Sequence, residues 1–184
     1  MSSLSRSAAA LALVALWSPA LASADPPPTA APSPSPRWYV TVATGAQAYL
    51  SPNRTMGGYG GGLGVRALFG KHLFAEADAA YLFEIGNVLA LRVSAGLQRD
   101  GLWAPAALVS LGVLAGQQFT FFQPGGPTLG GVPAAWIGLA VAPLRFQLGR
   151  AQVSVLQLGL GVGTDLPGLG LAPQLQVLEI AVAL

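Results

Sequence analysis

Three carboxylates stand at even positions in one apolar segment, His72 to Glu84. Glu76, Asp78 and Glu84 alternate there with odd positions occupied by Leu, Ala, Tyr and Phe. Successive side chains of an extended strand point to opposite faces, so this spacing predicts a strand with one apolar face and one carboxylate face. A row of carboxylates on one face can line an ion path or pair with cations.

Basic residues on the neighbouring segments predict partners for these carboxylates. A three-residue turn at Gly70–His72 would put Arg66 across from Glu76. Arg92, on the next segment along the chain, would come near Asp78. The predicted charge ladder, facing one interior space, comprises Arg66, Glu76, Asp78, Arg92 and Glu179. Two uses stay open at this point: closed ion pairs, which carboxylates in a confined interior require, or an ion-conducting path.

Two other motifs predict no chemistry. His72 is the only histidine, so it lacks the companions of a metal site and the partners of a catalytic pair. The stretch "GGYGGGLG", 57–64, does not match the G-x-G-x-x-G spacing of a nucleotide-binding loop. Its Gly60, Gly62 and Gly64 instead predict a column without side chains that lets a small barrel curve. We therefore expect no catalytic residues, no metal and no cofactor, and a protein that is not an enzyme.

The composition departs from that of ordinary soluble domains. Hydrophobic residues make up 53% of the 184 residues and charged residues only 9%, against roughly 25% in soluble domains. The net charge of +2 is too small to indicate nucleic-acid binding. The absence of cysteine excludes a disulfide framework.

The first 36 residues predict export followed by a spacer. Arg6, the apolar stretch "AAALALVALW" and the small residues Ala22 and Ala24 fit a signal peptide over residues 1–24, cleaved after Ala24. The rival interpretation, an uncleaved anchor helix, needs about 20 apolar residues, and this stretch is shorter than that. "DPPPTAAPSPSP", residues 25–36, predicts an extended proline-rich spacer in the periplasm.

The remainder, 37–184, reads as eight strands separated by Gly, Pro, Asn and Asp clusters. They are expected at 38–50, 59–69, 72–84, 88–98, 103–116, 135–148, 154–165 and 175–184, with a bulge near Pro143. Such strands are long enough to cross a bilayer when tilted, and an even number closes an antiparallel up-and-down transmembrane barrel. A helical inner-membrane protein would also explain the charge-free run 101–144, but prolines interrupt that run.

Turn lengths and aromatic residues predict the two ends of this barrel. Tight turns are expected at 70–72, 99–101 and 149–151, and long loops at Gly116–Pro133 and Thr164–Pro173, which is the pattern of outer-membrane barrels. Two aromatic girdles are expected at the headgroup levels. The first comprises Trp38, Phe69, Trp103 and Phe146 beside the tight turns; the second comprises Tyr49, Tyr59, Tyr81, Phe83, Phe119 and Trp136 beside the loops.

The order of signal peptide, spacer, the Gly-rich strand "YGGGLGVRALFG" and the terminal strand "VLEIAVAL" resembles the small outer-membrane β-barrel proteins of Gram-negative bacteria, including the eight-stranded domain of OmpA-like proteins. The resemblance covers Arg37 to Leu184. It implies an all-β transmembrane barrel in the outer membrane, with membrane lipid and the assembly machinery as partners. The family's final strand usually ends in Phe or Trp, whereas this chain ends in Leu184.

The function expected from these features is an envelope role that is either structural or mediated by loops. Phe119, Phe121 and Phe122, on the first long loop, are candidate contacts for an external partner of unknown identity. The alternative is a narrow passive channel, porin-like, in which the charge ladder lines the path.

Overall fold

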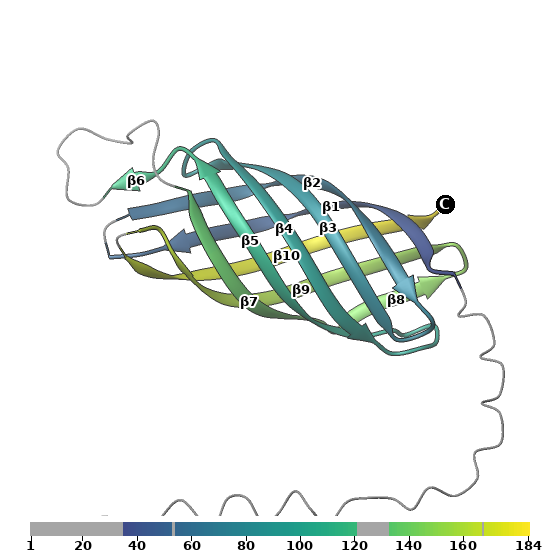
Figure 1. Ribbon diagram of the computed structural model, residues 1–184. Coiled ribbons are helices and arrows are strands. Elements are labelled where there is room, and N and C mark those ends of the chain that lie inside the picture. Colours follow the sequence, from purple (N-terminus) through teal and green to yellow (C-terminus); the bar gives the residue numbers. More distant parts are fainter. Residues whose placement is uncertain (1–34, 53, 121–132, 167) are drawn as a thin grey trace, which may run out of the picture. The chain divides into compact units, whose positions relative to one another are not determined.

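Strand pairing closes the chain into an antiparallel barrel (Figure 1). The computed structural model describes residues 35–52, 54–120, 133–166 and 168–184. The strands are β1 (Arg37–Leu50), β2 (Arg54–Phe69), β3 (Leu73–Glu84), β4 (Val88–Gln98), β5 (Ala106–Gly116), β6 (Phe119–Thr120), β7 (Ala134–Ala142), β8 (Leu144–Leu148), β9 (Ala151–Thr164) and β10 (Leu169–Ala183). The predicted signal peptide, and the predicted spacer up to residue 34, lie outside the described residues.

The barrel wall consists of eight strands, which we call staves; β7 and β8 count as one stave, and the short β6 is not counted. β1 pairs with both β2 and β10, which closes the sheet. β7 and β8 both pair with β9 and together form one interrupted stave. Within the described residues, the two-residue β6 pairs only with the start of β2. The predicted fold class, an eight-stranded antiparallel up-and-down barrel, is thereby confirmed.

The two ends of the barrel differ in their connections. We call "turn end" the end that carries the connections 70–72, 99–105 and 149–150 together with the C terminus, and "loop end" the end that carries β6 (Figure 1). The connections 51–53, 85–87 and 165–168 at the loop end are short as well. The long loop predicted at Thr164–Pro173 is therefore wrong. Leu169 and Leu171 alternate with Gly170 and Ala172, and this period-two pattern continues β10 beside β9.

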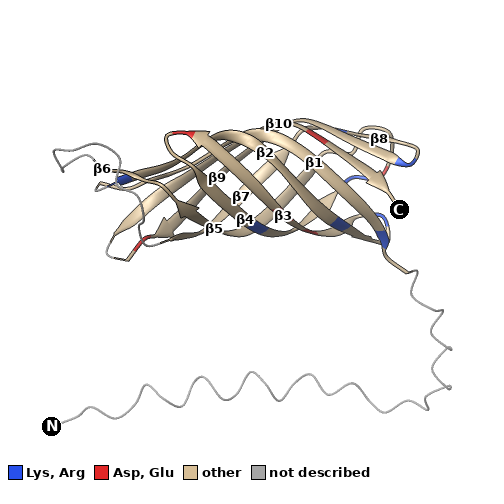
Figure 2. Ribbon diagram, turned by 90° about the horizontal axis from the view of Figure 1, so that it is seen from above, with Lys and Arg blue, Asp and Glu red and all other residues tan. Residues whose placement is uncertain are grey.

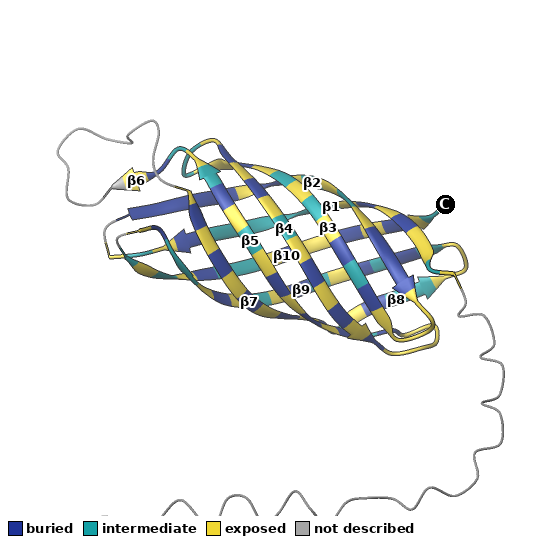
Figure 3. Ribbon diagram, in the orientation of Figure 1, coloured by how far each residue is buried: buried dark blue, intermediate teal, exposed yellow. Residues whose placement is uncertain are grey.

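Burial alternates along the strands with the period of two that the sequence predicts (Figure 3). In β4, the exposed side chains are Leu89, Leu91, Val93, Ala95 and Leu97. The residues between them are buried in the lumen or half-buried there. The apolar set thus faces outward and the mixed set faces inward, which reverses the arrangement of a soluble protein. In the described part of the chain there is no helix long and apolar enough to span a membrane.

Three adjacent staves change phase at the same level. The interruption between β7 and β8 falls at Pro143, Leu156 of β9 has a φ of 69°, and Val177 of β10 is skipped in the pairing with both neighbours. The bulge predicted near Pro143 is confirmed. Because an extra residue exchanges the inward and outward faces, the inward positions are even-numbered in β7 and odd-numbered in β8. This turns Arg145 into the lumen.

The aromatic residues follow the predicted girdles with two exceptions. The exposed rings are Trp38, Phe69 and Trp103 near the turn end, where Phe146 is half-buried, and Tyr59, Tyr81, Phe83 and Phe119 near the loop end. Tyr49 and Trp136 were predicted in the outer girdle, and that placement is wrong because both are buried in the lumen. Tyr49 lies on the odd-numbered inward face of β1. Trp136 lies over Gly112, where an added Cβ would come within 2.4 Å of the Trp136 ring.

Candidate functional site in the barrel lumen

Two cross-strand ion pairs occupy the middle of the lumen. Arg66 lies directly opposite Glu76 in the register of β2 and β3, and its Nε donates to Glu76 Oε2 at 2.8 Å. Arg92 lies directly opposite Asp78 in the register of β3 and β4, and its Nε donates to Asp78 Oδ2 at 2.8 Å. Arg92 Nη2 also lies 3.1 Å from Glu76 Oε1, which joins the two pairs into one network.

Glu179 joins this network from the other side of the barrel. Arg66 Nη2 donates to carboxylate oxygens of both Glu76 and Glu179. The amide of Gln176 donates to Glu179 Oε2 at 2.7 Å, and Arg66 Nη1 donates to Gln152 Oε1 at 2.9 Å. The structure therefore brings together all the residues of the predicted charge ladder, although they come from four different strands.

Arg145 is the member of this network that sequence reasoning missed. Its side chain is fully buried, with Nη2 3.7 Å from Glu179 Oε1 and the guanidinium carbon 5.1 Å from the centre of the Phe74 ring. Arg66 contacts the same ring at 5.4 Å. The sequence signal that could have revealed Arg145 is the phase change at Pro143, which moves odd-numbered residues of β8 to the inward face.

With Arg145 included, the charges of the lumen balance. The set that we call the charge layer consists of Arg66, Arg92 and Arg145 with Glu76, Asp78 and Glu179. Without Arg145 the layer would hold three carboxylates against two guanidinium groups. Removing charges from water is expensive unless opposite charges and hydrogen bonds compensate them, so neutrality is what makes this buried layer possible.

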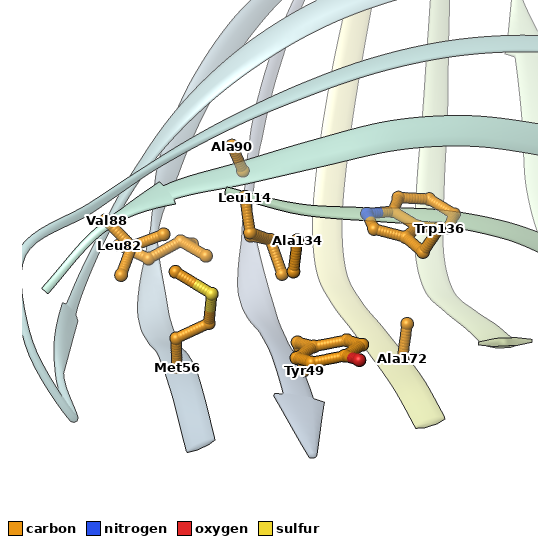
Figure 4. Close-up of a cluster of buried hydrophobic side chains, with 9 residues drawn as sticks. All are labelled: Tyr49, Met56, Leu82, Val88, Ala90, Leu114, Ala134, Trp136 and Ala172. Atoms are coloured by element: carbon orange, nitrogen blue, oxygen red, sulfur yellow. The ribbon is translucent and has the colours of Figure 1, made fainter. Parts of the chain in front are cut away.

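Two apolar layers flank the charge layer along the barrel axis. Along β3 the inward residues run from Phe74 through Glu76 and Asp78 to Leu82, so one strand crosses all three layers. The turn-end layer comprises Tyr39, Leu68, Phe74, Ala106, Leu108, Ala140, Ala142 and Ala181. The loop-end layer comprises Tyr49, Met56, Leu82, Val88, Ala90, Leu114, Ala134, Trp136 and Ala172 (Figure 4). Side chains of both layers fill the interior, as expected for a barrel of this size.

A small cavity of about 60 Å³ borders the charge layer. Its walls include Thr41, Gln157 and Gln176, and it reaches Asp78 and Arg92. Gln47 and Gln174 also line it, and the buried atoms Gln47 Nε2 and Gln174 Oε1 have no hydrogen-bond partner among the described residues. Glycines of β2 open this space: at Gly62, an added Cβ would come within 2.8 Å of Ala80 Cβ.

A second buried ion pair lies near the loop end and was also missed from the sequence. Arg54 Nε donates to Asp165 Oδ2 at 2.6 Å, and Arg54 Nη1 donates to Gln118 Oε1. The Gly168 amide donates to Asp165 Oδ1 at 2.8 Å. Burial raises the pKa of the Asp165 carboxyl, but hydrogen bonds from Arg54 and Gly168, together with the Arg54 charge, hold that pKa below its ordinary value. The pair ties β2 to the connection between β9 and β10.

The remaining sequence candidates do not enter this site. Glu84, predicted to face the lumen with Glu76 and Asp78, is exposed at the end of β3, where its φ of 97° departs from strand geometry, so that prediction is wrong. Phe119 is exposed on β6, and Phe121 and Phe122 lie outside the described residues. The Nδ1 atom of His72 lies 3.2 Å from the carbonyl oxygen of Gln98 at the turn end.

The arrangement suits structural charge pairing better than catalysis or metal binding. The carboxylates of the charge layer are engaged by arginine, which competes with any metal ion for the same oxygens. Among the residues that the structure describes, no group of three His, Cys, Asp or Glu side chains is placed to hold a metal ion.

Comparison with known proteins places the fold. The structure is similar to that of Neisserial surface protein A (NspA), with a TM-score of 0.55 and 8% identity over 80% of this chain and 97% of that chain. The chain shares the fold of NspA. At this identity the likeness concerns the fold alone, and the resemblance inferred from the sequence holds at that level.

Two further solved structures are similar at lower TM-scores. The N-terminal β-barrel domain of Pseudomonas aeruginosa OprF has a TM-score of 0.47 and 13% identity, with 79% of this chain and 97% of that chain covered. The structure of Ail, the attachment invasion locus protein of Yersinia pestis, was solved with the heparin analogue sucrose octasulfate. Its TM-score is 0.46 and its identity is 12%, with 82% of this chain and 99% of that chain covered. No protein-family model matches the chain, and no curated protein matches it.

The two fully buried arginines beside Phe74 predict unequal costs of substitution. Arg66→Met removes hydrogen bonds to two carboxylates and should lower the free energy of unfolding by about 3 to 5 kcal/mol. Arg145→Met removes one ion pair at 3.7 Å, and no hydrogen-bond partner for its guanidinium is found among the described residues, so the loss should be less than half as large. Urea unfolding of both variants in detergent measures the difference. Equal losses would contradict this account of the layer.

The Arg54–Asp165 pair predicts a pH-dependent contribution to stability. Because the pKa of Asp165 is lower in the folded state, the contribution is present above its ordinary pKa of about 3.9 and is lost as pH falls through the lowered value. At pH 7, Asp165→Asn should lower the free energy of unfolding by roughly 3 kcal/mol, and the deficit should shrink in acid.

The control for that experiment is Asp100→Asn. Asp100 forms an exposed pair with Lys71, with 3.3 Å between the charged atoms, and exposed pairs contribute little. Denaturant unfolding of both variants and of the original protein across pH gives the comparison. A deficit for Asp165→Asn that does not change with pH would show that the carboxylate charge is not responsible.

Proposed function

We propose that the chain is a non-enzymatic β-barrel protein of the bacterial outer membrane. The observation that supports this most strongly is the distribution of charge on the barrel. Every charged side chain of 37–184 belongs to the charge layer, to the buried Arg54–Asp165 pair, or to one of the two ends of the barrel. The outward face between the ends carries none. A belt of side chains that faces lipid lacks charges because a charge in lipid is destabilising, whereas a belt that faces water carries charged residues.

The dimensions of the staves fit the same proposal. β4 and β5 each have 11 residues, and about 9 to 11 tilted residues suffice to cross the hydrocarbon core of a bilayer. Pairing of β1 with both β2 and β10 closes the sheet, so that the backbone groups of neighbouring strands bind one another, and this is required where no water can bind free backbone groups. Exposed aromatic rings near both ends suit the two headgroup levels.

Within that location, the lumen supports an envelope role that is structural or mediated by the loop end. The neutral charge layer and the two apolar layers lie in series along the barrel axis, and this supports a lumen that is closed to ions. Membrane lipid and the assembly machinery are then the partners that any such barrel requires. An external partner would meet the loop end, where Phe119 is exposed.

A narrow passive channel is the second candidate. It is favoured by the small cavity of about 60 Å³ beside Asp78 and Arg92, which could form part of a wet path. The loop-end apolar layer of Tyr49, Leu114 and Trp136 would have to move for that path to reach the outside.

The lipid-facing belt predicts a cost of charge that depends on depth. Val93 and Leu97 both face outward on β4, Val93 at the centre of the strand and Leu97 near the turn end. Val93→Arg should lower the free energy of unfolding in vesicles by about 2 to 4 kcal/mol, and Leu97→Arg should lower it by about 0 to 1 kcal/mol. Denaturant titration of Val93→Arg and Leu97→Arg in lipid vesicles measures both. A water-facing belt would tolerate both substitutions equally, which is the outcome that rejects the proposal.

A further inference from the structure

Figure 2 marks the charged residues along the chain, and of these most of the exposed ones lie at the turn end. Four exposed basic residues lie there: Arg37, Lys71, Arg99 and Arg150. The one acidic side chain of the connections at that end is Asp100, which pairs with Lys71. The described side chains of this end therefore carry a clear excess of positive charge.

The loop end has no such excess. Its exposed charged residue in the described part of the chain is Glu84, and the Arg54–Asp165 pair is buried and neutral. The sequence of residues 121–132 contains no charged residue at all. The exterior of the barrel is thus electrostatically polarised along its axis, although the chain as a whole carries a net charge of only +2.

The four cations are distributed around the rim and do not form one patch. Arg37 begins β1, Lys71 lies between β2 and β3, Arg99 follows β4, and Arg150 lies between β8 and β9. In the order of the staves these positions span most of the circumference. A single docked protein covers one side of such a rim, whereas the lipids of a bilayer surround it completely. The arrangement therefore fits a ring of anionic groups.

Aromatic side chains at the same level place these cations at a membrane interface. Trp38, Phe69 and Trp103 are exposed near the turn end. The Arg99 guanidinium lies 5.7 Å from the centre of the Trp103 ring, and Trp103 Nε1 donates to the Pro143 carbonyl oxygen at 2.8 Å. Tryptophan prefers the headgroup region, so a guanidinium held against its ring lies at the depth of lipid phosphates.

We propose that this basic rim, Arg37, Lys71, Arg99 and Arg150, binds the phosphates of anionic lipid headgroups and selects them over zwitterionic lipids. This inference rests on the proposed membrane location. Basic side chains near a charged membrane surface are individually weak attractors that act together, and salt screens them. The exposed Lys71–Asp100 pair does not oppose such binding because it can exchange partners at little cost.

Tryptophan fluorescence in vesicles tests the rim directly. Trp38 and Trp103 are exposed at the rim, whereas Trp136 is buried in the lumen near the loop end and supplies a constant background. The full mature chain is reconstituted into phosphatidylcholine vesicles that contain a small fraction of a brominated lipid. This lipid is either phosphatidylglycerol or phosphatidylcholine, brominated near the headgroup in both cases. Both leaflets have the same composition, so the orientation of the barrel does not matter.

We expect brominated phosphatidylglycerol to quench about three to five times more effectively per lipid than brominated phosphatidylcholine at low salt. About 1 M salt should abolish the difference. The variant Lys71→Gln with Arg150→Gln should lose most of the selectivity. The matched control Glu84→Gln, which removes an exposed charge from the loop end, should retain it.

The outcomes separate this proposal from the membrane proposal beneath it. Quenching by neither brominated lipid means that the barrel does not lie in the bilayer, and both proposals fail. Equal quenching by the two lipids leaves the membrane location intact and overturns the basic rim. The basic rim would also be overturned if the double variant Lys71→Gln/Arg150→Gln kept the full selectivity. Those residues would then have no part in the lipid preference.

Discussion

Six charged side chains can lie inside a barrel of eight strands only if their charges neutralise one another. Three guanidinium groups and three carboxylates balance in the charge layer; Arg66 and Arg92 hydrogen-bond to the carboxylates, whereas Arg145 is held through charge alone, 3.7 Å from Glu179. Much of the architecture follows from it. The three-residue turn at 70–72 sets Arg66 opposite Glu76, and a shift of one residue would turn either side chain to the outside. The bulge at Pro143 supplies the third cation by turning Arg145 inward.

The apolar exterior is the counterpart of this charged interior. A chain with few charges keeps them off the outward belt by placing them in the lumen or at the two ends, and the belt that remains is compatible with lipid. The glycines of β2 and β5 serve the interior in a different way. Gly62 leaves room beside Ala80, and Gly112 leaves room for the Trp136 ring. Small residues on the inner wall thus decide which large side chains can fill the lumen.

Local patterns were sufficient to predict the number of strands, the antiparallel barrel and the two cross-strand neighbour relations of β3. These features depend on alternation within a strand and on the length of one turn. The features that were missed depend on several segments at once. Arg145 faces inward only because β7, β9 and β10 change phase together, and Arg54 meets Asp165 across 111 residues of sequence. Tyr49 and Trp136 were misplaced because a position near a strand end does not reveal which face a ring occupies.

The central claim is that the charge layer and its flanking apolar layers close the lumen. Electrical recording from planar bilayers containing the reconstituted full mature chain tests it most directly. The arginines and carboxylates of the charge layer bind one another, and an apolar layer lies on each side of them along the axis. We therefore expect a bilayer that contains folded barrels to conduct no more than a bare one. Sustained single-channel steps, with an ion selectivity that changes when Asp78 is replaced by Asn, would show instead that the charge layer lines an open path.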